Sequence, residues 1–152
     1  MTADVQPPHR LLVAVDFSEP SRRALELAHR LRAGLHAAVE VAYVLVDPFA
    51  DRGGAPPESI WASEKELLAY EEGVRKELAG EVERVFGPDA QAVVQHVVRG
   101  TPVTELLALA EERGSDLLLV GTTGKSGVER ALLGSVSLAL VRRSKVPVVT
   151  VP

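Results

Sequence analysis

Residues 117–135 read LLLVGTTGKSGVERALLGS, and this stretch decides the fold. Four apolar residues run directly into Gly121, a second glycine follows at Gly124, and Gly134 comes after nine more residues. A short apolar run that ends in a glycine turn is typical of a buried strand. Because a helical pattern opens at Ser135, we expect a strand, a glycine-spaced loop and a helix in succession.

The same alternation of strands and helices extends over the rest of the chain. Apolar runs rich in valine predict strands at residues 11–15, 39–46, 92–98, 117–120 and 146–151. Apolar residues at helical spacing predict helices at residues 18–35, 67–85, 101–114 and 135–143. Parallel strands need helical crossovers, so we predict a single domain over residues 1–152. Its expected fold is α/β, a doubly wound five-stranded parallel sheet with helices on both faces, which is Rossmann-like.

The composition excludes several classes of function. A net charge of -4 leaves no positive field that would collect nucleic acid or anionic lipid. The chain has no cysteine, which removes disulfides, thiolate metal sites and thiol nucleophiles and fits a reducing compartment. Its first ten residues lack the apolar segment of a signal peptide, and no apolar run is long enough to span a bilayer. We therefore expect a cytoplasmic protein that binds neither nucleic acid nor membrane.

The glycine-spaced loop suits the binding of nucleotide phosphates. Gly121 and Gly124 allow sharp backbone turns and let N–H groups approach a ligand's oxygens. Gly134 and Ser135 lie at a predicted helix N-terminus, where free N–H groups and the helix dipole attract phosphate. The alternative is that these glycines serve only a tight turn and a helix cap. For any single glycine, a turn or a cap is the better interpretation, but the combined spacing of the glycines after a strand favours phosphate binding.

Two further features concern the same edge of the sheet. Asp16 follows the first predicted strand, where its carboxylate can accept hydrogen bonds from a ribose or a base, or can cap the next helix. Residues 124–126 read GKS and imitate the end of a P-loop. The first glycine of that motif would fall at Leu119, inside a strand, so a P-loop is disfavoured.

Other polar features are predicted to be structural or simply solvated. The four histidines lack metal-ligand spacing, so we assign neither a metal site nor a catalytic residue. Arg22 and Arg23 are expected on a solvated helix face. Residues 47–58 are rich in glycine and proline and are predicted as a loop, which serves either as a flap or as slack.

Gly121, Gly124, Gly134 and Ser135 match the signature G-x-x-G, nine residues, G-[ST] of the ATP-binding branch of the universal stress protein family. The chain resembles this family over nearly its whole length, from LLVAVDFS at the first strand to PVVTV at the end. The resemblance implies a sheet of the adenine nucleotide alpha hydrolase-like type. It also implies a homodimer formed through the last strand, an apolar edge that would otherwise lie exposed.

The resemblance further implies a set of binding residues. Adenine and ribose contacts would come from Ala14, Val15, Asp16 and Leu45. Phosphate contacts would come from Gly121, Thr123, Gly124, Gly134, Ser135, Val136 and Ser137. Many family members carry a histidine where this chain has Thr123, so a contact by that side chain is not carried over.

Two functions of different classes follow from these observations. A complete cradle for ATP without evident catalytic groups predicts a nucleotide-dependent regulatory or stress-response module that acts on an unknown protein partner. The alternative is a slow Mg-dependent ATPase or autokinase, in which Asp16 acts through Mg²⁺ and phosphate. A nucleotide-free interaction protein ranks last, because the chain retains the glycine signature.

Overall fold

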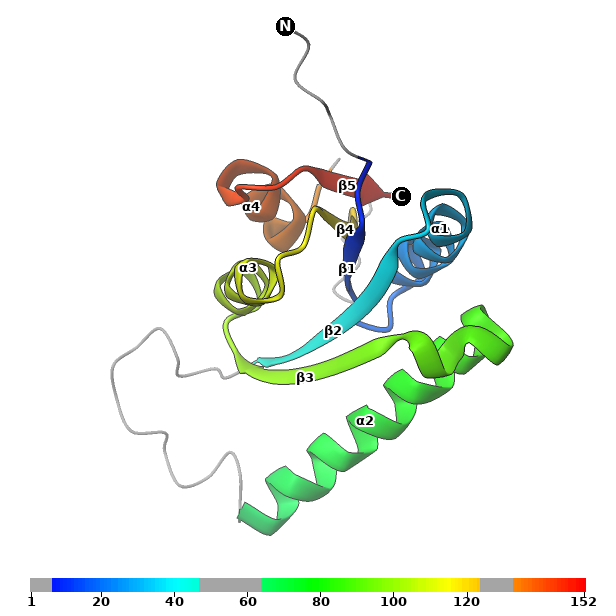
Figure 1. Cartoon of the computed structure of the whole chain (residues 1–152). Coiled ribbons are helices and arrows are strands. Elements are labelled where there is room, and N and C mark those ends of the chain that lie inside the picture. Colours follow the sequence, from blue (N-terminus) through cyan, green and yellow to red (C-terminus); the bar gives the residue numbers. More distant parts are fainter. Residues whose placement is uncertain (1–6, 47–63, 124–132) are drawn as a thin grey trace, which may run out of the picture.

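The computed structural model describes residues 7–46, 64–123 and 133–152, and these form a parallel sheet between helices (Figure 1). The strand order is β3-β2-β1-β4-β5. The strands are β1 (Arg10–Ala14), β2 (Ala38–Val46), β3 (Val94–Gly100), β4 (Leu117–Gly121) and β5 (Val148–Val151). The helices are α1 (Glu19–Leu35), α2 (Glu64–Phe86), α3 (Pro102–Arg113) and α4 (Ser135–Arg143), with a short 3-10 helix η1 (Gly87–Ala92). The predicted doubly wound α/β fold is confirmed.

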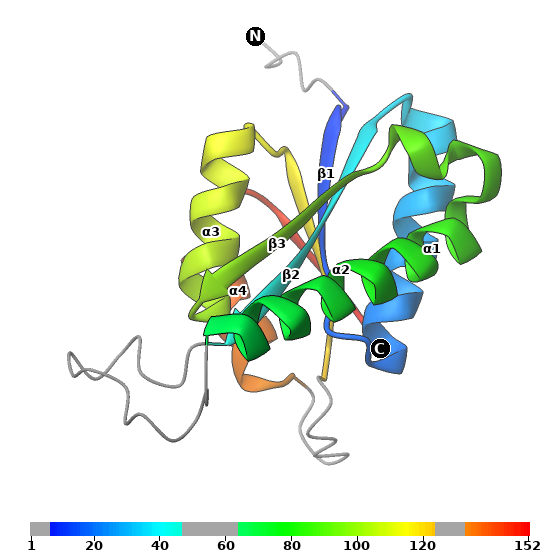
Figure 2. The ribbon, with the colours of Figure 1, turned by 90° about the horizontal axis from the view of Figure 1, so that it is seen from below.

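Helices cover both faces of the sheet, with α1 and α2 on one side and α3 and α4 on the other (Figure 2). Side chains alternate along a strand, so β1 contributes to both cores. Leu11 and Val13 face α1 and α2, whereas Leu12 and Ala14 face α3 and α4. Within the described ranges, no helix combines the length and hydropathy needed to cross a membrane.

Helix α1 begins and ends as its sequence predicts. Ser18 has extended backbone, and its Oγ accepts a hydrogen bond from the Ser21 N–H at 3.3 Å. Pro20 occupies the first turn, where its missing N–H leaves no bond unmade. The helix ends at His36, which adopts the left-handed conformation (φ 53°) and donates its N–H to the Arg32 carbonyl.

The third strand begins later than predicted. Residues 92–98 were expected to be extended, but Ala92 still belongs to η1, and β3 runs from Val94 to Gly100. Gly87 has a φ of 54°, and Pro88 follows it, so the chain leaves α2 and tightens into a single 3-10 segment. The strand therefore starts two residues after the predicted boundary and ends two residues beyond the predicted end.

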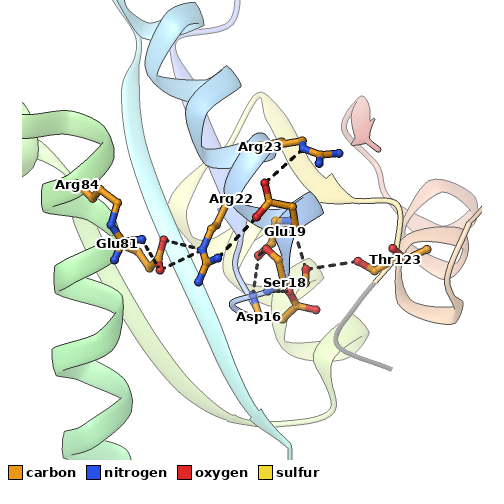
Figure 3. A network of polar contacts seen from close by, with 9 residues as sticks. Asp16, Ser18, Glu19, Arg22, Arg23, Glu81, Arg84 and Thr123 are labelled. Atoms are coloured by element: carbon orange, nitrogen blue, oxygen red, sulfur yellow. Dashed lines mark hydrogen bonds and ion pairs between the residues drawn. The ribbon is translucent and has the colours of Figure 1, made fainter. Parts of the chain in front are cut away.

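An ion pair between α1 and the buried Glu81 of α2 corrects the prediction for Arg22. The Arg22 Nε lies 3.2 Å from each carboxylate oxygen of Glu81, a residue of α2 that is only 3% exposed (Figure 3). Arg84 adds a second guanidinium, with Nη1 2.9 Å from Glu81 Oε1. Arg22 is therefore an anchor between two helices and not simply a solvated side chain. A buried carboxylate needs such partners, because an unpaired one would be strongly destabilising.

A second buried carboxylate, Glu40, ties β2 to β3 and α3 near the amino ends of the strands. Glu40 is 3% exposed, and its Oε2 lies 2.8 Å from Arg113 Nε and 2.6 Å from His96 Nε2. Burial raises the pKa of Glu40, but the hydrogen bonds from Arg113 and His96 lower it by more, so the pKa lies below its usual value of 4.5. The ionised form is therefore the one that stabilises the fold.

We expect Glu40→Gln to lower the free energy of unfolding by about 2 kcal/mol at pH 7, because the charge-assisted bonds to Arg113 and His96 are weakened. The pKa of Glu40 is depressed in the folded state, so its contribution is present above about pH 4.5 and is lost as the pH falls through the folded value. Urea denaturation between pH 3 and pH 7 should show the difference from the wild type shrinking below about pH 4.5.

The exposed Glu83 of α2 supplies the matched control. Glu83→Gln should change the free energy of unfolding by less than about 0.5 kcal/mol at every pH. A difference between Glu40→Gln and the wild type that stays constant down to pH 3 would contradict the assignment of the charged form to the folded state.

Candidate functional site

A cavity of about 300 Å³ lies at the carboxyl ends of β1 and β4. These two strands are neighbours in the sheet, although the chain passes through β2 and β3 between them. The helix that follows β1 covers one face and the helix that follows β4 covers the other, so a crevice opens where the strand order reverses. The cavity lies in that crevice, at the edge of the sheet that the sequence predicts.

Most of the residues predicted from the sequence meet in this cavity. Its lining includes Ala14, Val15, Asp16, Gly121, Thr123, Gly134, Ser135, Val136 and Ser137. Leu45 is not in the lining, because its side chain packs into the core between the sheet and α1 and α2. Its strand neighbours Val44 and Val46 line the cavity instead. Gly124 lies outside the described residues, as do the GKS segment at 124–126 and the loop at 47–58.

The apolar half of the cavity was not predicted. It is formed by Ala42 and Val44 of β2 and by Pro102 and Leu106 of α3. The sequence does hold a signal for it, because the rule that ligands bind beyond the carboxyl ends of parallel strands applies to β2 as well as to β1 and β4.

The polar half is built around the N-terminus of α4. Gly134 is the N-cap of α4, and no side chain caps this helix. The Gly134 N–H donates to the Thr122 carbonyl at 2.5 Å, and the first bond within the helix runs from the Leu138 N–H to the Gly134 carbonyl. The N–H groups of Ser135, Val136 and Ser137 precede that bond, so they are the donors that a helix start leaves without an intrahelical partner.

Helix starts are the source of positive backbone dipole ends in the described lining of the cavity. The described lining contains no lysine or arginine, and Asp16 is its one carboxylate. The N-terminal turns of α1, α3 and α4 all contribute to it, through Ser21, Pro102 and Ser135. Converging helix N-termini attract anions without any cationic side chain. Within the described ranges, no cluster of three or more His, Cys, Asp or Glu could hold a metal ion by itself.

Asp16 is held in place by the turn that leads into α1 (Figure 3). Its Oδ1 accepts a hydrogen bond from the Ser18 N–H at 2.9 Å. Ser18, and not Asp16, is the N-cap of the helix, so the capping role left open for Asp16 belongs to Ser18. The Ser18 Oγ also lies 3.4 Å from the Thr123 carbonyl, to which it donates, and this contact links the end of β1 to the end of β4.

Phe17 shapes the same turn through an unusual backbone conformation. Its φ of 64° is left-handed, which bulky residues rarely adopt, yet its side chain is only 7% exposed. The ring stacks on Tyr43 with centroids 4.8 Å apart, and this burial offsets the strain. Burial, together with the nearby Tyr70 and Asp16, raises the pKa of Tyr43 to about 12, so its phenol stays protonated at neutral pH.

Gly121 is explained by packing. A Cβ at this position would lie 2.8 Å from Pro20 Cβ and 2.8 Å from the Ser21 backbone nitrogen. The φ of Gly121 is not positive, so no unusual backbone conformation requires a glycine here. The first turn of α1 packs directly against the end of β4, and only a residue without a side chain allows this approach.

Comparison with known proteins identifies the family. The model of the Universal stress protein family matches residues 8–152, nearly the whole chain. This chain belongs to the universal stress protein family. Among its relatives in that family is Universal stress protein MJ0531 from Methanocaldococcus jannaschii. The two are 33% identical over 143 residues, which cover 93% of this chain and 81% of the relative.

Solved structures of other universal stress proteins share the fold. Universal stress protein UspA from Lactobacillus plantarum superposes with a TM-score of 0.79 at 20% identity, over 95% of this chain and 97% of that one. A universal stress protein in complex with cAMP superposes with a TM-score of 0.68 at 27% identity, over 96% of this chain and 98% of that one.

We expect Gly121→Ala to lower the free energy of unfolding by about 1 to 3 kcal/mol, because the added methyl group forces α1 away from β4. Gly80→Ala is the matched control, since Gly80 lies in α2 and a Cβ there meets nothing within 4 Å. The control should stabilise the protein by up to about 1 kcal/mol. Urea denaturation of both variants checks this, and a Gly121→Ala protein as stable as the wild type would refute the close approach.

Proposed function

We propose that this universal stress protein binds an adenine nucleotide, ATP above all, in the cavity between β1 and β4. The observation that carries the proposal is the order of chemical groups along the sheet edge. Neighbouring strands β2, β1 and β4 present in turn an apolar wall, the carboxylate of Asp16 and the open N-terminus of α4. A nucleotide has the same order of base, ribose and phosphate. The universal stress protein solved with cAMP supports this class of ligand.

The apolar half suits a purine base. Ala42 and Val44 of β2 lie on one side of this space and Leu106 of α3 on the other, and none of them carries a charge. A flat aromatic ring gains from burial there at about 25 cal/mol for each Å² of apolar surface removed from water.

Asp16 suits the ribose. One of its oxygens is committed to the Ser18 N–H, which fixes the direction of the carboxylate. An ionised carboxylate accepts hydrogen bonds from hydroxyl groups, and such charge-assisted bonds are stronger than neutral ones. A Mg²⁺ ion accompanying ATP binds mainly to phosphate oxygens and water and needs one or two carboxylates, so Asp16 is sufficient for it.

The start of α4 suits the phosphates. The N–H groups of Ser135 and Val136 stand before the first hydrogen bond within the helix, and both residues line the cavity. Phosphate at a helix N-terminus is stabilised by these donors and by the helix dipole. The ATPase or autokinase alternative gains no further support in the described lining, where Asp16 is the one ionised side chain.

Nucleotide binding at this site makes the protein a regulatory module by changing a surface that a protein partner recognises. We propose that this surface includes the free side of β5. In the described sheet β5 is an edge strand that pairs with β4, and its four residues are half-buried. A second copy of the chain would cover such an edge by continuing the sheet or by packing against it.

We expect Gly134→Asp to weaken ATP binding by about tenfold or more. A Cβ at this position lies 3.2 Å from the Thr122 carbonyl oxygen, and the added carboxylate would repel both that oxygen and the phosphates. Isothermal titration with ATP measures the effect, and Gly80→Asp places the same charge on the exposed side of α2 as a control. Equal affinities for the wild type and Gly134→Asp would refute the site, and no binding by the wild type would refute the function.

We expect Asp16→Asn to weaken ATP binding by about tenfold, because the amide retains the acceptor for the Ser18 N–H but loses the charged acceptor for the ribose. The direction of the change in ATP affinity distinguishes a ribose contact by Asp16 from mere proximity to the phosphates. A carboxylate that merely stood near the phosphates would repel them, so its neutralisation would tighten binding. Titrations with and without EDTA separate a ribose contact, which persists without metal, from a contact through Mg²⁺. Tighter binding by Asp16→Asn in both conditions would contradict the proposed role.

A further inference from the structure

The hydroxyl group of Ser137 lies beside the phosphate end of the cavity but faces the protein. Ser137 stands in the first turn of α4 and is 2% exposed. Its Oγ lies 2.9 Å from the Thr122 carbonyl oxygen and 3.0 Å from the Gly134 carbonyl oxygen. A hydroxyl group carries a single proton, and both neighbours are acceptors, so that proton is directed at carbonyl groups of the chain. The Ser137 oxygen can then offer a ligand only its acceptor lone pairs, and phosphate oxygens are acceptors themselves, so the two do not form a hydrogen bond.

From this geometry we propose that Ser137 is a positioning residue for phosphate binding, with its hydroxyl locking the start of α4 onto the end of β4. The inference rests on the proposed nucleotide site and assigns the side chain a role other than direct phosphate contact. The lock holds the N–H groups of Ser135 and Val136 at a fixed place and angle. Donors held in advance bind an anion more tightly than donors that must first be ordered.

The Thr122 carbonyl is the fixed point of this arrangement. It accepts hydrogen bonds from the Gly134 N–H at 2.5 Å and from the Ser137 Oγ at 2.9 Å, so both of its lone pairs are used. On its other side, the Thr122 N–H donates to the Val151 carbonyl of β5 at 2.8 Å. Thr122, which accepts the hydrogen bond from the Ser137 hydroxyl, is thus itself held by a hydrogen bond to the sheet.

A comparison of α1 with α4 shows why this kind of anchor is needed. At α1, the Ser18 hydroxyl caps the helix and takes up the Ser21 N–H. At α4, the N-cap is Gly134, and a side-chain cap there would occupy a donor that the phosphate requires. Ser137 anchors the helix start through carbonyl oxygens and so leaves the N–H groups of the first turn free for a ligand.

The matched pair Ser137→Ala and Ser144→Ala tests the inference. Ser144 is at the other end of α4, where its Oγ donates to the Val146 carbonyl at 2.8 Å, so both variants lose a hydroxyl bonded to a backbone carbonyl. Titration with ATP and with adenosine separates phosphate binding from base and ribose binding. Ser137→Ala should lose about tenfold in ATP affinity and keep its adenosine affinity within about twofold. Ser144→Ala should keep both affinities within about twofold.

Amide hydrogen exchange in the ligand-free proteins separates positioning from direct contact. The Leu138 N–H closes the first turn of α4 on the Gly134 carbonyl, so loss of the lock should speed its exchange by about tenfold in Ser137→Ala. Ser137→Thr keeps a hydroxyl that can reach both the Thr122 and the Gly134 carbonyl, so it should restore slow exchange and ATP affinity to within about threefold of the wild type. This variant also keeps the inference testable if Ser137→Ala does not fold.

Several results would overturn the inference. One is unchanged ATP affinity in Ser137→Ala, and another is an equal loss for ATP and adenosine, which would mark a purely structural role. A weaker affinity for ATP with unchanged exchange in the ligand-free protein would assign the hydroxyl to direct phosphate contact. Failure of the wild type to bind either ligand would instead refute the proposed function, and the inference would fall with it.

Discussion

The parallel pairing of β1 with β4 is the constraint on which the rest of this structure depends. Leu11 lies opposite Leu117 in this pair, and the two strands leave the core together at their carboxyl ends. The chain reaches β4 only after it has built β2 and β3 on the far side of β1, so the helices around this pair diverge to opposite faces. Gly121 lets the first turn of α1 close tightly against β4 below the crevice. Gly121 therefore belongs both to the packing of α1 on β4 and to the lining of the cavity, so a substitution there changes both.

Charge is distributed in this molecule by a simple division. Glu40 is buried beside Arg113 and His96, and Glu81 is buried beside two guanidinium groups, so these carboxylates hold helices against the sheet and against each other. The described lining of the cavity keeps one carboxylate, Asp16, and takes its positive potential from backbone N–H groups at the ends of helices. Fixed backbone dipoles lose no side-chain entropy when an anion binds, unlike a flexible lysine.

The sequence predicted what depends on local pattern and missed what depends on register and distance. The alternation of strands and helices, the Ser18 cap and the start of α4 at Ser135 all follow from short-range rules, and the structure has them. Leu45 shows the limit, because a shift of one residue along a strand moves a side chain to the other face, and β2 turns Val44 to the cavity in its place. The partner of Arg22 lies 59 residues away, so no local pattern indicates it. The acceptors of the Ser137 hydroxyl likewise become visible only in three dimensions.

Thr122 has a consequence for how motion can pass through the molecule. Its N–H is bonded to Val151 of the outermost strand, and its carbonyl is bonded to the first turn of α4. Between these two bonds lie only the φ and ψ rotations of a single residue, so a rotation that relaxes one bond misaligns the other. The outermost strand and the start of α4, which lines the cavity, are therefore connected through a single residue. A displacement of either element therefore acts on the geometry of Thr122, where the bond to the other element begins.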